Sequence, residues 1–423
     1  MQQRELIRSH LCLQSVVAML RVLLWCAALV QSLAPPFDAR RRCTVPRRAA
    51  PGANARRSAL LPLGAAPGAD AATPAEATAD AASTPHTRRK RYAGRYPRHF
   101  SERHKEHDGD AATIKRVLEK GGTPAGTHIP IMISECLEHL NASDAAVAVD
   151  CTLGYGGHSS ALIAALPQNA RLLCFDRDGI ELTKTSKRLA PLASDGKVEL
   201  DAVHANYACV SAELAQRKLR ASCLLADLGC SSMQIDDPDR GFTFKRDGPL
   251  DMRMGLAEAT AAEFLRRASI KEVAAALRDG ADFSRRDSRE IAVAVLKEPV
   301  PATTTLLADR VRAVRLEEED CSGDDAVKRA MQSLRIAVND EFAALDELLA
   351  SLPDILAPGG RAVFLTFHSG EDRRVKKSFK KGIASGIYVD ATRRPVRPSP
   401  QERRANSRSG CCKLRWCVRA LDS

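Results

Sequence analysis

The chain has 423 residues, 44% of them hydrophobic and 27% charged, and its formal net charge is +12. This length and apolar content allow two or three domains with a sizeable core. No stretch reaches the roughly 20 apolar residues of a membrane-spanning helix, so we expect no membrane partner for the mature form.

The positive charge is concentrated toward the two ends of the chain. Residues 1–100 hold 16 Lys and Arg against 5 Asp and Glu, whereas residues 101–423 hold 48 against 47. Within the second range, residues 371–419 hold 15 basic and 4 acidic residues. A localised basic segment is the electrostatic footprint of a protein that binds a phosphate backbone. A solvated basic tail has the same composition, and charge alone does not separate the two.

The thirteen cysteines do not indicate a metal site. The sequence contains no C-x-x-C, and Cys411, Cys412 and Cys417 lack both zinc spacing and a nearby histidine. We therefore expect no metal, and scattered cysteines of this kind indicate reduced thiols in a reducing compartment.

The first hundred residues have the composition of a two-part targeting leader. Residues 1–34 are signal-peptide-like, with Arg4 and Arg8 before an apolar run and small residues at the end. Residues 35–100 form a transit-peptide-like, low-complexity leader and linker, rich in Ala and Arg. A signal followed by a transit segment is typical of plastids bounded by extra membranes, so we expect the plastid (chloroplast) stroma. A mitochondrial leader and a leader without an address remain open.

Beyond the leader the pattern changes to alternating strands and helices. Apolar runs that suit buried strands lie at 147–150, 171–178, 198–207 and 223–229. A helix-like segment separates the second run from the third, and such alternation predicts an α/β fold with a parallel, doubly wound sheet. Ligands of such sheets bind beyond the carboxyl ends of the strands, where the candidate binding residues fall.

The turn DCTLGYGGHSS (150–160) places three glycines and a histidine where a strand passes into a helix. The dinucleotide fingerprint G-x-G-x-x-G fails here, because Ser159 stands at its third glycine. An acid at the head of the turn, Asp150, suits the ammonium group of S-adenosylmethionine. Asp176 is placed to accept hydrogen bonds from ribose hydroxyls. The pattern favours a methyl donor, with a dinucleotide and a purely structural turn as the alternatives.

A stretch from about residue 237 to 330 interrupts the strands and predicts an inserted helical subdomain. Its segment SIKEVAAALRDG carries a capping box, Ser269 and Glu272, and Gly280 as a stop signal. Two more helical segments follow, REIAVAVLKE and TLLADRVRAVRLEEE. The insert is expected to form a wall for RNA, or a lid without RNA contact.

Six blocks, which include the glycine turn, occur in order along the chain. They are HIPIMISECLEHL (128–140), VDCTLGYGGHSS (149–160), CFDRD (174–178), LLADLGCSSMQIDDPDRGFTFKRDGPLDMRM (224–254), QSLRIAVNDEFAAL (332–345) and APGGRAVFLTFHSGEDRRVKKSF (357–379). Together they resemble the bacterial-type 16S ribosomal RNA cytosine-N4 methyltransferases, the RsmH or MraW family, over about 125–418.

The resemblance implies a Rossmann-like, S-adenosylmethionine-dependent methyltransferase. Its substrate would be the exocyclic N4 of a cytidine in the decoding centre of small-subunit rRNA, and its partner that rRNA or the small ribosomal subunit. The core would come in two parts, 125–236 and 331–418, around the insert 237–330, with the basic C-terminal segment in the second part. The cofactor contacts carried over position by position are Gly156, Gly157, His158, Asp176, Tyr207 (phenylalanine in the family), Asp227 and Gln234.

Departures from the family pattern gather in the substrate half. The family's DLGVSSPQ is DLGCSSMQ here, with Cys230 and Met233, and FHSLEDR is FHSGEDR, with Gly370. Residues 410–412 are Gly-Cys-Cys where the family has Arg-Ser-Ala. Two functions therefore stay open: the rRNA methyltransferase in an organelle, and a catalytically weakened ribosome-assembly factor that binds rRNA on the same fold.

Methylation at N4 needs acceptors that hold the amine, because the N4 lone pair is delocalised into the cytosine ring. The Asp/Asn-Pro-Pro-aromatic motif of DNA amino-methyltransferases is absent, and DLGCSS stands in its place. The sequence does not rank the catalytic candidates, which are Asp227, Ser231, Ser232, Asp251, Asn339 and His368.

A basic cluster follows the last block and predicts contact with the RNA backbone. Its residues are Arg373, Arg374, Lys376 and Lys377, on a helix expected to open at Ser369. Lys and Arg on phosphate position the RNA without reading its bases.

Overall fold

The computed structural model of the chain describes residues 130–255, 259–317 and 323–422. These residues belong to one compact unit. Within the described ranges no helix is long and apolar enough to cross a bilayer. The leader and linker expected over 1–100 lie outside the described residues.

A seven-stranded sheet forms the centre, in the order β3-β2-β1-β4-β5-β7-β6. Strands β1 to β5 pair in parallel, and β7 is antiparallel to both of its neighbours. The strands are β1 (Val147–Asp150), β2 (Arg171–Asp176), β3 (Glu199–His204), β4 (Ala221–Asp227), β5 (Leu356–Thr366), β6 (Tyr388–Ala391) and β7 (Lys413–Arg419). The strand order reverses between β1 and β4, which is the point where doubly wound sheets bind their ligands. The predicted fold class is confirmed.

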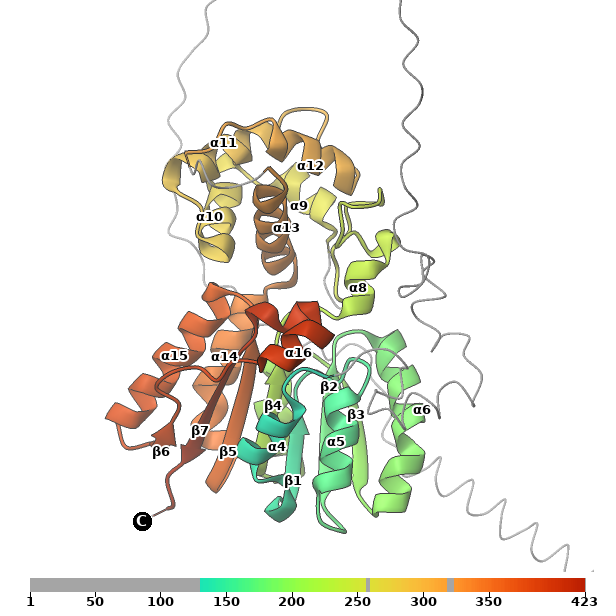
Figure 1. Cartoon of the computed structure of the whole chain (residues 1–423), viewed down its shortest axis with the longest axis vertical. Coiled ribbons are helices and arrows are strands. Elements are labelled where there is room, and N and C mark those ends of the chain that lie inside the picture. The colour runs from blue at the N-terminus through green and yellow to red at the C-terminus, as the bar shows by residue number, and fades with distance from the viewer. Residues whose placement is uncertain (1–129, 256–258, 318–322, 423) are drawn as a thin grey trace, which may run out of the picture. The chain divides into compact units, whose positions relative to one another are not determined.

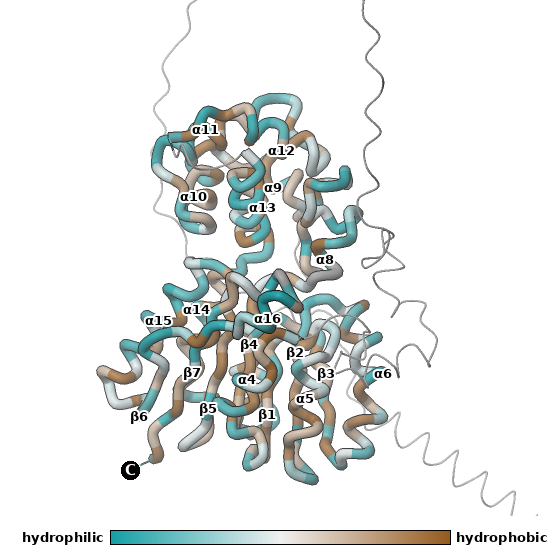
Figure 2. The backbone as a smooth tube through the Cα atoms, viewed as in Figure 1, coloured by the Kyte–Doolittle hydropathy of each residue, from teal (hydrophilic) through white to brown (hydrophobic). Residues whose placement is uncertain are grey.

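Helices cover both faces of this sheet (Figure 1). One face carries α4 (Ile133–Leu140), α5 (Gly157–Ala165) and α6 (Gly179–Gly196), and the other carries α7 (Val210–Arg217), α14 (Glu341–Ile355) and α15 (Ser369–Ala384). Successive strand residues alternate between the two cores: Leu172 joins the first, and Leu173 joins the second. Because helices cover both faces of the central strands, the side chains on both faces are buried, and the strand sequences are apolar throughout. Figure 2 shows these strands as hydrophobic.

The interruption between β4 and β5 is helical, as predicted. Its elements are α8 (Ser232–Asp236), η3 (Pro238–Arg240), α9 (Ala261–Arg267), α10 (Ile270–Ala281), α11 (Arg285–Val295), α12 (Thr304–Arg312) and α13 (Gly323–Asn339). Helices α9 to α13 share a hydrophobic core of their own. The expected boundary at 330/331 falls inside α13, which carries the chain from the insert to the start of α14 (Figure 1).

Helix α10 begins as predicted and ends differently. Ser269 and Glu272 form the expected capping box. The helix runs through Gly280 to Ala281, and Asp282 takes the left-handed position with φ 54°. A Cβ on Gly280 would lie 2.8 Å from the Cα of Ser333, so this glycine allows α10 and α13 to pack closely rather than stopping the helix.

Shorter elements complete the described chain. They are η1 (Ala142–Asp144), η2 (Tyr207–Cys209), α16 (Pro400–Ala405) and η4 (Ser407–Cys411). Helix α16 and η4 lie between β6 and β7 in the sequence, and Figure 1 shows α16 beyond the ends of the central strands, on the side from which the insert projects.

Candidate active site

A cleft of about 460 Å³ opens at the carboxyl ends of the central strands. The glycine turn after β1, the ends of β2 and β4 and the short helix η2 line it. Residues from the start of α14 and from the C-terminal segment complete its wall. The cleft therefore lies at the switch point of the sheet, where the sequence predicted a ligand.

Asp150 organises the turn and does not face the cleft. It is fully buried, and its carboxylate accepts from the Thr152 N–H at 3.0 Å and from the Ser159 hydroxyl at 2.6 Å. The Thr152 hydroxyl in turn accepts from the backbone N–H of Asp227 at 2.8 Å. The expectation that Asp150 would meet an ammonium group is wrong, because these bonds turn the carboxylate inward, where it ties β1 to α5.

Gly156 is required by both backbone and packing. Its φ is +71°, in the left-handed region that L side chains rarely adopt. A Cβ there would lie 2.8 Å from Cγ2 of Thr185 and 3.0 Å from Cδ1 of Leu189, both on α6. Gly156 thus lets the turn lie against α6, and Gly157 and His158 follow it as the first residues of α5.

Asp176 ends β2 and lines the cleft. Its carboxylate accepts from the Gly154 N–H at 2.7 Å and from the Asp178 N–H at 2.8 Å. Burial raises the pKa of Asp176 to about 6, although the two backbone N–H groups oppose that shift. Each carboxylate oxygen has a further lone pair, so Asp176 holds the glycine turn and can also accept from a diol.

His158 and Asp227 meet in the same cleft. The Nε2 of His158 donates to the carbonyl of Ile131 at 3.0 Å, and its Nδ1 lies 3.5 Å from Oδ2 of Asp227. Oδ1 of Asp227 is buried and has no hydrogen-bond partner among the described residues. A buried acceptor without a donor costs free energy, so this oxygen suits a donor brought by a ligand. The ammonium group of S-adenosylmethionine is such a donor.

Tyr207 and Gln234 also line the cleft, as expected for cofactor contacts. Tyr207 begins η2 after β3, and its hydroxyl donates to the carbonyl of Glu341 at 3.4 Å. The Ser231 hydroxyl accepts from the Gln234 N–H, and the Gln234 amide oxygen accepts from the Ser231 N–H, which together cap α8. The structure therefore brings all seven predicted cofactor residues to the turn or to the cleft.

One wall of the cleft holds an ion pair that sequence reasoning missed. The guanidinium of Arg335 donates to both carboxylate oxygens of Glu341, at 2.8 and 3.0 Å, and to Sγ of Cys230 at 3.2 Å. All three side chains line the cleft, and the two charged ones are nearly buried. Their block, QSLRIAVNDEF, carried the resemblance, but only its asparagine had been singled out.

The catalytic candidates divide between the cleft and the base of the insert. Asp227, Ser231 and His368 line the cleft, and nothing is described of the Ser232 side chain. Asn339 is buried: its amide nitrogen donates to the Met252 carbonyl at 2.7 Å, and its oxygen accepts from the Met254 N–H at 2.9 Å. Asp251 pairs with Arg253 through both of its oxygens.

His368 caps α15. Its Nδ1 accepts from the Glu371 N–H at 3.4 Å, and its Nε2 lies 3.0 Å from Oε1 of the same residue. Burial of Glu371 is outweighed by the His368 and Phe367 hydrogen bonds and by Arg335, so the pKa of this carboxyl lies below its usual value. Nδ1 is thus engaged in the helix cap, whereas Nε2 is buried next to the Glu371 carboxylate without a hydrogen-bond partner among the described residues.

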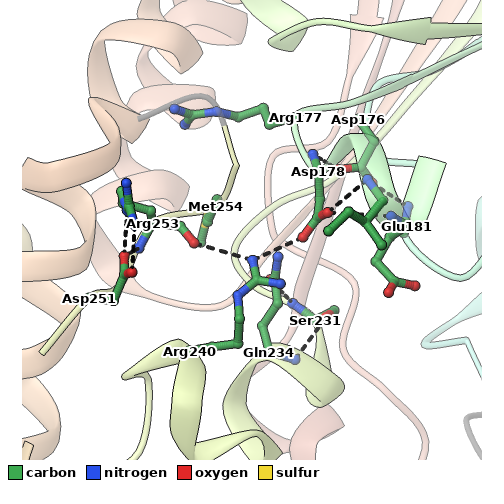
Figure 3. Close-up of polar contacts among 12 residues, drawn as sticks. Asp176, Arg177, Asp178, Glu181, Ser231, Gln234, Arg240, Asp251, Arg253 and Met254 are labelled. Carbon is green, nitrogen blue, oxygen red and sulfur yellow. Dashed lines mark hydrogen bonds and ion pairs between the residues drawn. The ribbon is translucent and has the colours of Figure 1, made fainter. Parts of the chain in front are cut away.

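Residues at both ends of the insert contact the turn that follows β2 (Figure 3). Arg240 pairs with Oδ2 of Asp178 at 2.9 Å and donates to the Arg253 carbonyl at 3.2 Å. On the other side, the Arg177 guanidinium donates to the Asn339 carbonyl at 2.7 Å. The turn that presents Asp176 is therefore fixed by contacts from both ends of the insert.

The predicted RNA cluster lies on α15, which begins at Ser369 as expected. Arg373 pairs with Asp282 at 2.8 Å. Arg374 pairs with Asp346 at 3.3 Å and lies 3.6 Å from the centre of the Phe342 ring. Lys376 and Lys377 are exposed. None of the four lines the cleft.

Comparisons with known proteins identify a family that this chain matches over most of its length. Residues 125–420 match the family described as the MraW methylase family. The chain is 40% identical over 344 residues to ribosomal RNA small subunit methyltransferase H 1 of Lachnoclostridium phytofermentans, covering 79% of this chain and 93% of the relative. It is 42% identical over 346 residues to the protein of that name from Agathobacter rectalis, covering 79% and 98%. Among solved structures, an rRNA methylase from Streptococcus thermophilus is similar with a TM-score of 0.31 and 12% identity, over 68% of this chain and 94% of that one.

Proposed function

The chain belongs to the MraW methylase family, and we propose that it methylates the exocyclic N4 of a cytidine in the decoding centre of a 16S-type organelle small-subunit rRNA. It is an S-adenosylmethionine-dependent methyltransferase, as its family is. The names of its relatives support a small-subunit rRNA substrate, and the chain covers 93% and 98% of two of them. The single observation that carries the proposal is the buried Oδ1 of Asp227, which has no hydrogen-bond partner within the described part of the chain and lies in a cleft at the switch point of the sheet.

The cofactor supplies a methyl group on a positively charged sulfonium. Asp176, already held by two backbone N–H groups, would accept from its ribose hydroxyls. Asp227 would hold the ammonium end, and the Tyr207 ring would face the adenine. These residues come from the ends of β2 and β4 and from η2, so the sheet itself sets their spacing.

The target base must leave its stack before N4 can be reached. The N4 lone pair is a poor nucleophile, so orientation of the amine supplies much of the rate. The acceptors that line the cleft on the side of α8 and α14 are the Ser231 hydroxyl and the Glu341 carboxylate. The Arg335 guanidinium donates to both oxygens of Glu341 in a bidentate pair, which holds this acceptor in place at the cleft wall.

A transfer assay tests the proposal directly. Purified protein is incubated with labelled S-adenosylmethionine and small ribosomal subunits that lack the modification, and digested rRNA is analysed for N4-methylcytidine. We expect label in N4-methylcytidine at one site. An Asp227→Ala variant that still binds subunits should give none. Subunit binding by the wild-type protein without any transfer would favour the assembly-factor alternative.

The organelle assignment rests on residues 1–100, with their two-part composition. We propose plastid targeting, and fluorescent fusions test it. Residues 1–34 should direct a fluorescent protein into the secretory route, and residues 1–100 should direct it to the plastid. Mitochondrial fluorescence with the longer fusion would contradict the two-part leader.

A further inference from the structure

A second basic surface, distinct from α15, lies at the mouth of the cleft. We define the arginine segment as residues 393–408, which hold six arginines and one acid, Glu402. It contains α16, whose tube is hydrophilic in Figure 2. Asn406 and Arg408 of the segment line the cleft itself. The charge is therefore adjacent to the place where the chemistry occurs.

The segment is anchored at three points. Val396 exchanges two backbone hydrogen bonds of 3.0 Å with Leu414 of β7. Oε1 of Glu402 accepts from the Met132 N–H, before α4, at 2.7 Å. Arg408 donates to Oδ1 of Asp236, at the end of α8, at 2.7 Å. These contacts hold the segment across the cleft mouth, between the sheet and the insert.

Four of its arginines carry charge that the protein does not neutralise. Arg393, Arg394, Arg403 and Arg404 are exposed, and they have no carboxylate partner among the described residues. Glu402, the one acid of the segment, is already bonded to the Met132 N–H. Positive charge left uncompensated next to a cleft attracts a polyanion.

The basic cluster on α15 (Arg373, Arg374, Lys376 and Lys377) differs from the arginine segment in how its charges are paired and in its place relative to the cleft. Arg373 and Arg374 are paired with Asp282 and Asp346. Lys376 and Lys377 are exposed. At the start of α15, the N-cap residue His368 lines the cleft. Pairing lowers the net charge that this helix offers to a phosphate, and none of the four basic residues of the cluster lines the cleft.

We propose that the arginine segment, rather than the basic face of α15, is the principal surface that binds RNA phosphates beside the target nucleotide. The inference rests on the proposed rRNA substrate. When a base enters the cleft, its backbone must cross the cleft mouth, beside the segment whose Asn406 and Arg408 line the cleft. A guanidinium donates two parallel hydrogen bonds to a phosphate, so fixed arginines there would position the strand without specifying its sequence.

Matched charge removal separates the two surfaces. The probe is an unmodified transcript of a 16S-type small-subunit rRNA, and the dissociation constant is measured across a range of salt concentrations. Two double variants of the full chain each remove two positive charges: Arg403→Gln with Arg404→Gln, and Lys376→Gln with Lys377→Gln. Titration calorimetry with S-adenosylmethionine checks that each variant still folds and binds cofactor.

The arginine pair should flatten the slope of log affinity against log salt by up to about 1.4, since each phosphate contact on single strands contributes about 0.7. Its affinity at 0.1 M salt should fall roughly tenfold, whereas the lysine pair should stay close to the wild type. An equal or larger effect of the lysine pair overturns the proposal. Failure of the rRNA proposal has a different signature: the wild-type protein would not methylate the transcript or small subunits, whatever the salt slopes.

Discussion

The Nδ1 of His158 lies 3.5 Å from Oδ2 of Asp227, while Nε2 of the same ring donates to the Ile131 carbonyl. A carbonyl only accepts, so Nε2 carries a proton. A hydrogen bond between Nδ1 and Oδ2 then needs a second proton, from an imidazolium or from a protonated carboxyl. The bond to Ile131 thus orients the ring so that Nδ1 faces Asp227, next to the Oδ1 that has no partner among the described residues and that we assign to the ligand.

The first prediction concerns the pH dependence of cofactor binding. Burial raises the pKa of Asp227 to about 6, and His158 opposes that rise. An ammonium group needs the carboxylate, so affinity for S-adenosylmethionine should fall as the pH drops through about 6. Asp227→Asn should bind more weakly at pH 7.5, and its affinity should fall less steeply below pH 6. Asp176, whose pKa is also raised to about 6, supplies the remaining dependence.

The raised pKa of Asp227 makes the ligand-free protein more stable at low pH, whereas it weakens cofactor binding there. The native-state pKa of Asp227 lies above its ordinary value of 3.8, so the native protein binds the proton more tightly than the unfolded chain. The stability that the group contributes is present below pH 4 and is lost as the pH rises through about 6. Asp227→Asn should therefore raise the melting temperature more at pH 8 than at pH 5. A uniform change at both values would contradict the assignment.

The second prediction is that Asp176→Ala weakens S-adenosylmethionine binding by about 1.5–3 kcal/mol, or roughly tenfold or more. The substitution removes the proposed ribose acceptor and releases the Gly154 N–H from β2. Asp201→Ala is the matched control, because this carboxylate lies on β3 and pairs at 3.9 and 4.0 Å with two arginines outside the cleft. Calorimetric titration measures both, and unchanged affinity for Asp176→Ala would mean that the ribose binds elsewhere.

The third prediction tests the glycine turn. Gly156→Ala places a Cβ at a positive φ and within 2.8 Å of Thr185, so it should destabilise the fold by about 2–4 kcal/mol and abolish cofactor binding. Gly410→Ala is the control, because nothing lies within 4 Å of its added Cβ. Denaturant unfolding gives the free energies. Equal behaviour of the two variants would show that the turn is not constrained as described.

The fourth prediction concerns the ion pair between Arg240 of the insert and Asp178 in the turn after β2. Arg240→Met should lower stability by about 1–3 kcal/mol, because it leaves the buried Asp178 carboxylate without its ion pair. It should also weaken cofactor binding, since Asp178 and Asp176 share one turn. Asp178→Asn keeps a side-chain oxygen that can cap α6. The two single variants and the double variant form a double-mutant cycle, in which the coupling free energy between Arg240 and Asp178 should be about 0.5–3 kcal/mol. Additive effects of the two substitutions on the free energy of unfolding would contradict the coupling. Arg266→Met, at an exposed position on α9, is the control for removal of one positive charge.

The sequence predicted those features that depend on local pattern. Apolar runs located β1 to β4, and their carboxyl ends located Asp176 and Asp227, because parallel strands end at the same edge of a sheet. It could not predict the inward turn of Asp150, because two acids at strand ends look alike until their donors are placed. The sequence predicts a stop at Gly280, because its packing partner Ser333 lies on another helix and is not apparent from local pattern.

Two ion pairs account for the rest. Arg240 pairs with Asp178 only when the insert folds against the sheet. Arg335 and Glu341 are six residues apart and meet where α13 passes into α14, a spacing that no helical or strand periodicity marks. The resemblance covered the three blocks that hold these residues, but a block of matching letters does not say which side chains enter the cleft. The basic C-terminal charge was visible in the composition, whereas its division into paired α15 arginines and unpaired ones near α16 needed coordinates.

The most direct test of the central claim is a map of N4-methylcytidine in organelle small-subunit rRNA, compared between cells with and without the gene. The proposed function predicts one modified cytidine in the decoding centre, present with the gene, lost without it, and restored by the wild-type chain but not by Asp227→Ala. The same mark persisting at full level in the absence of the gene would contradict it.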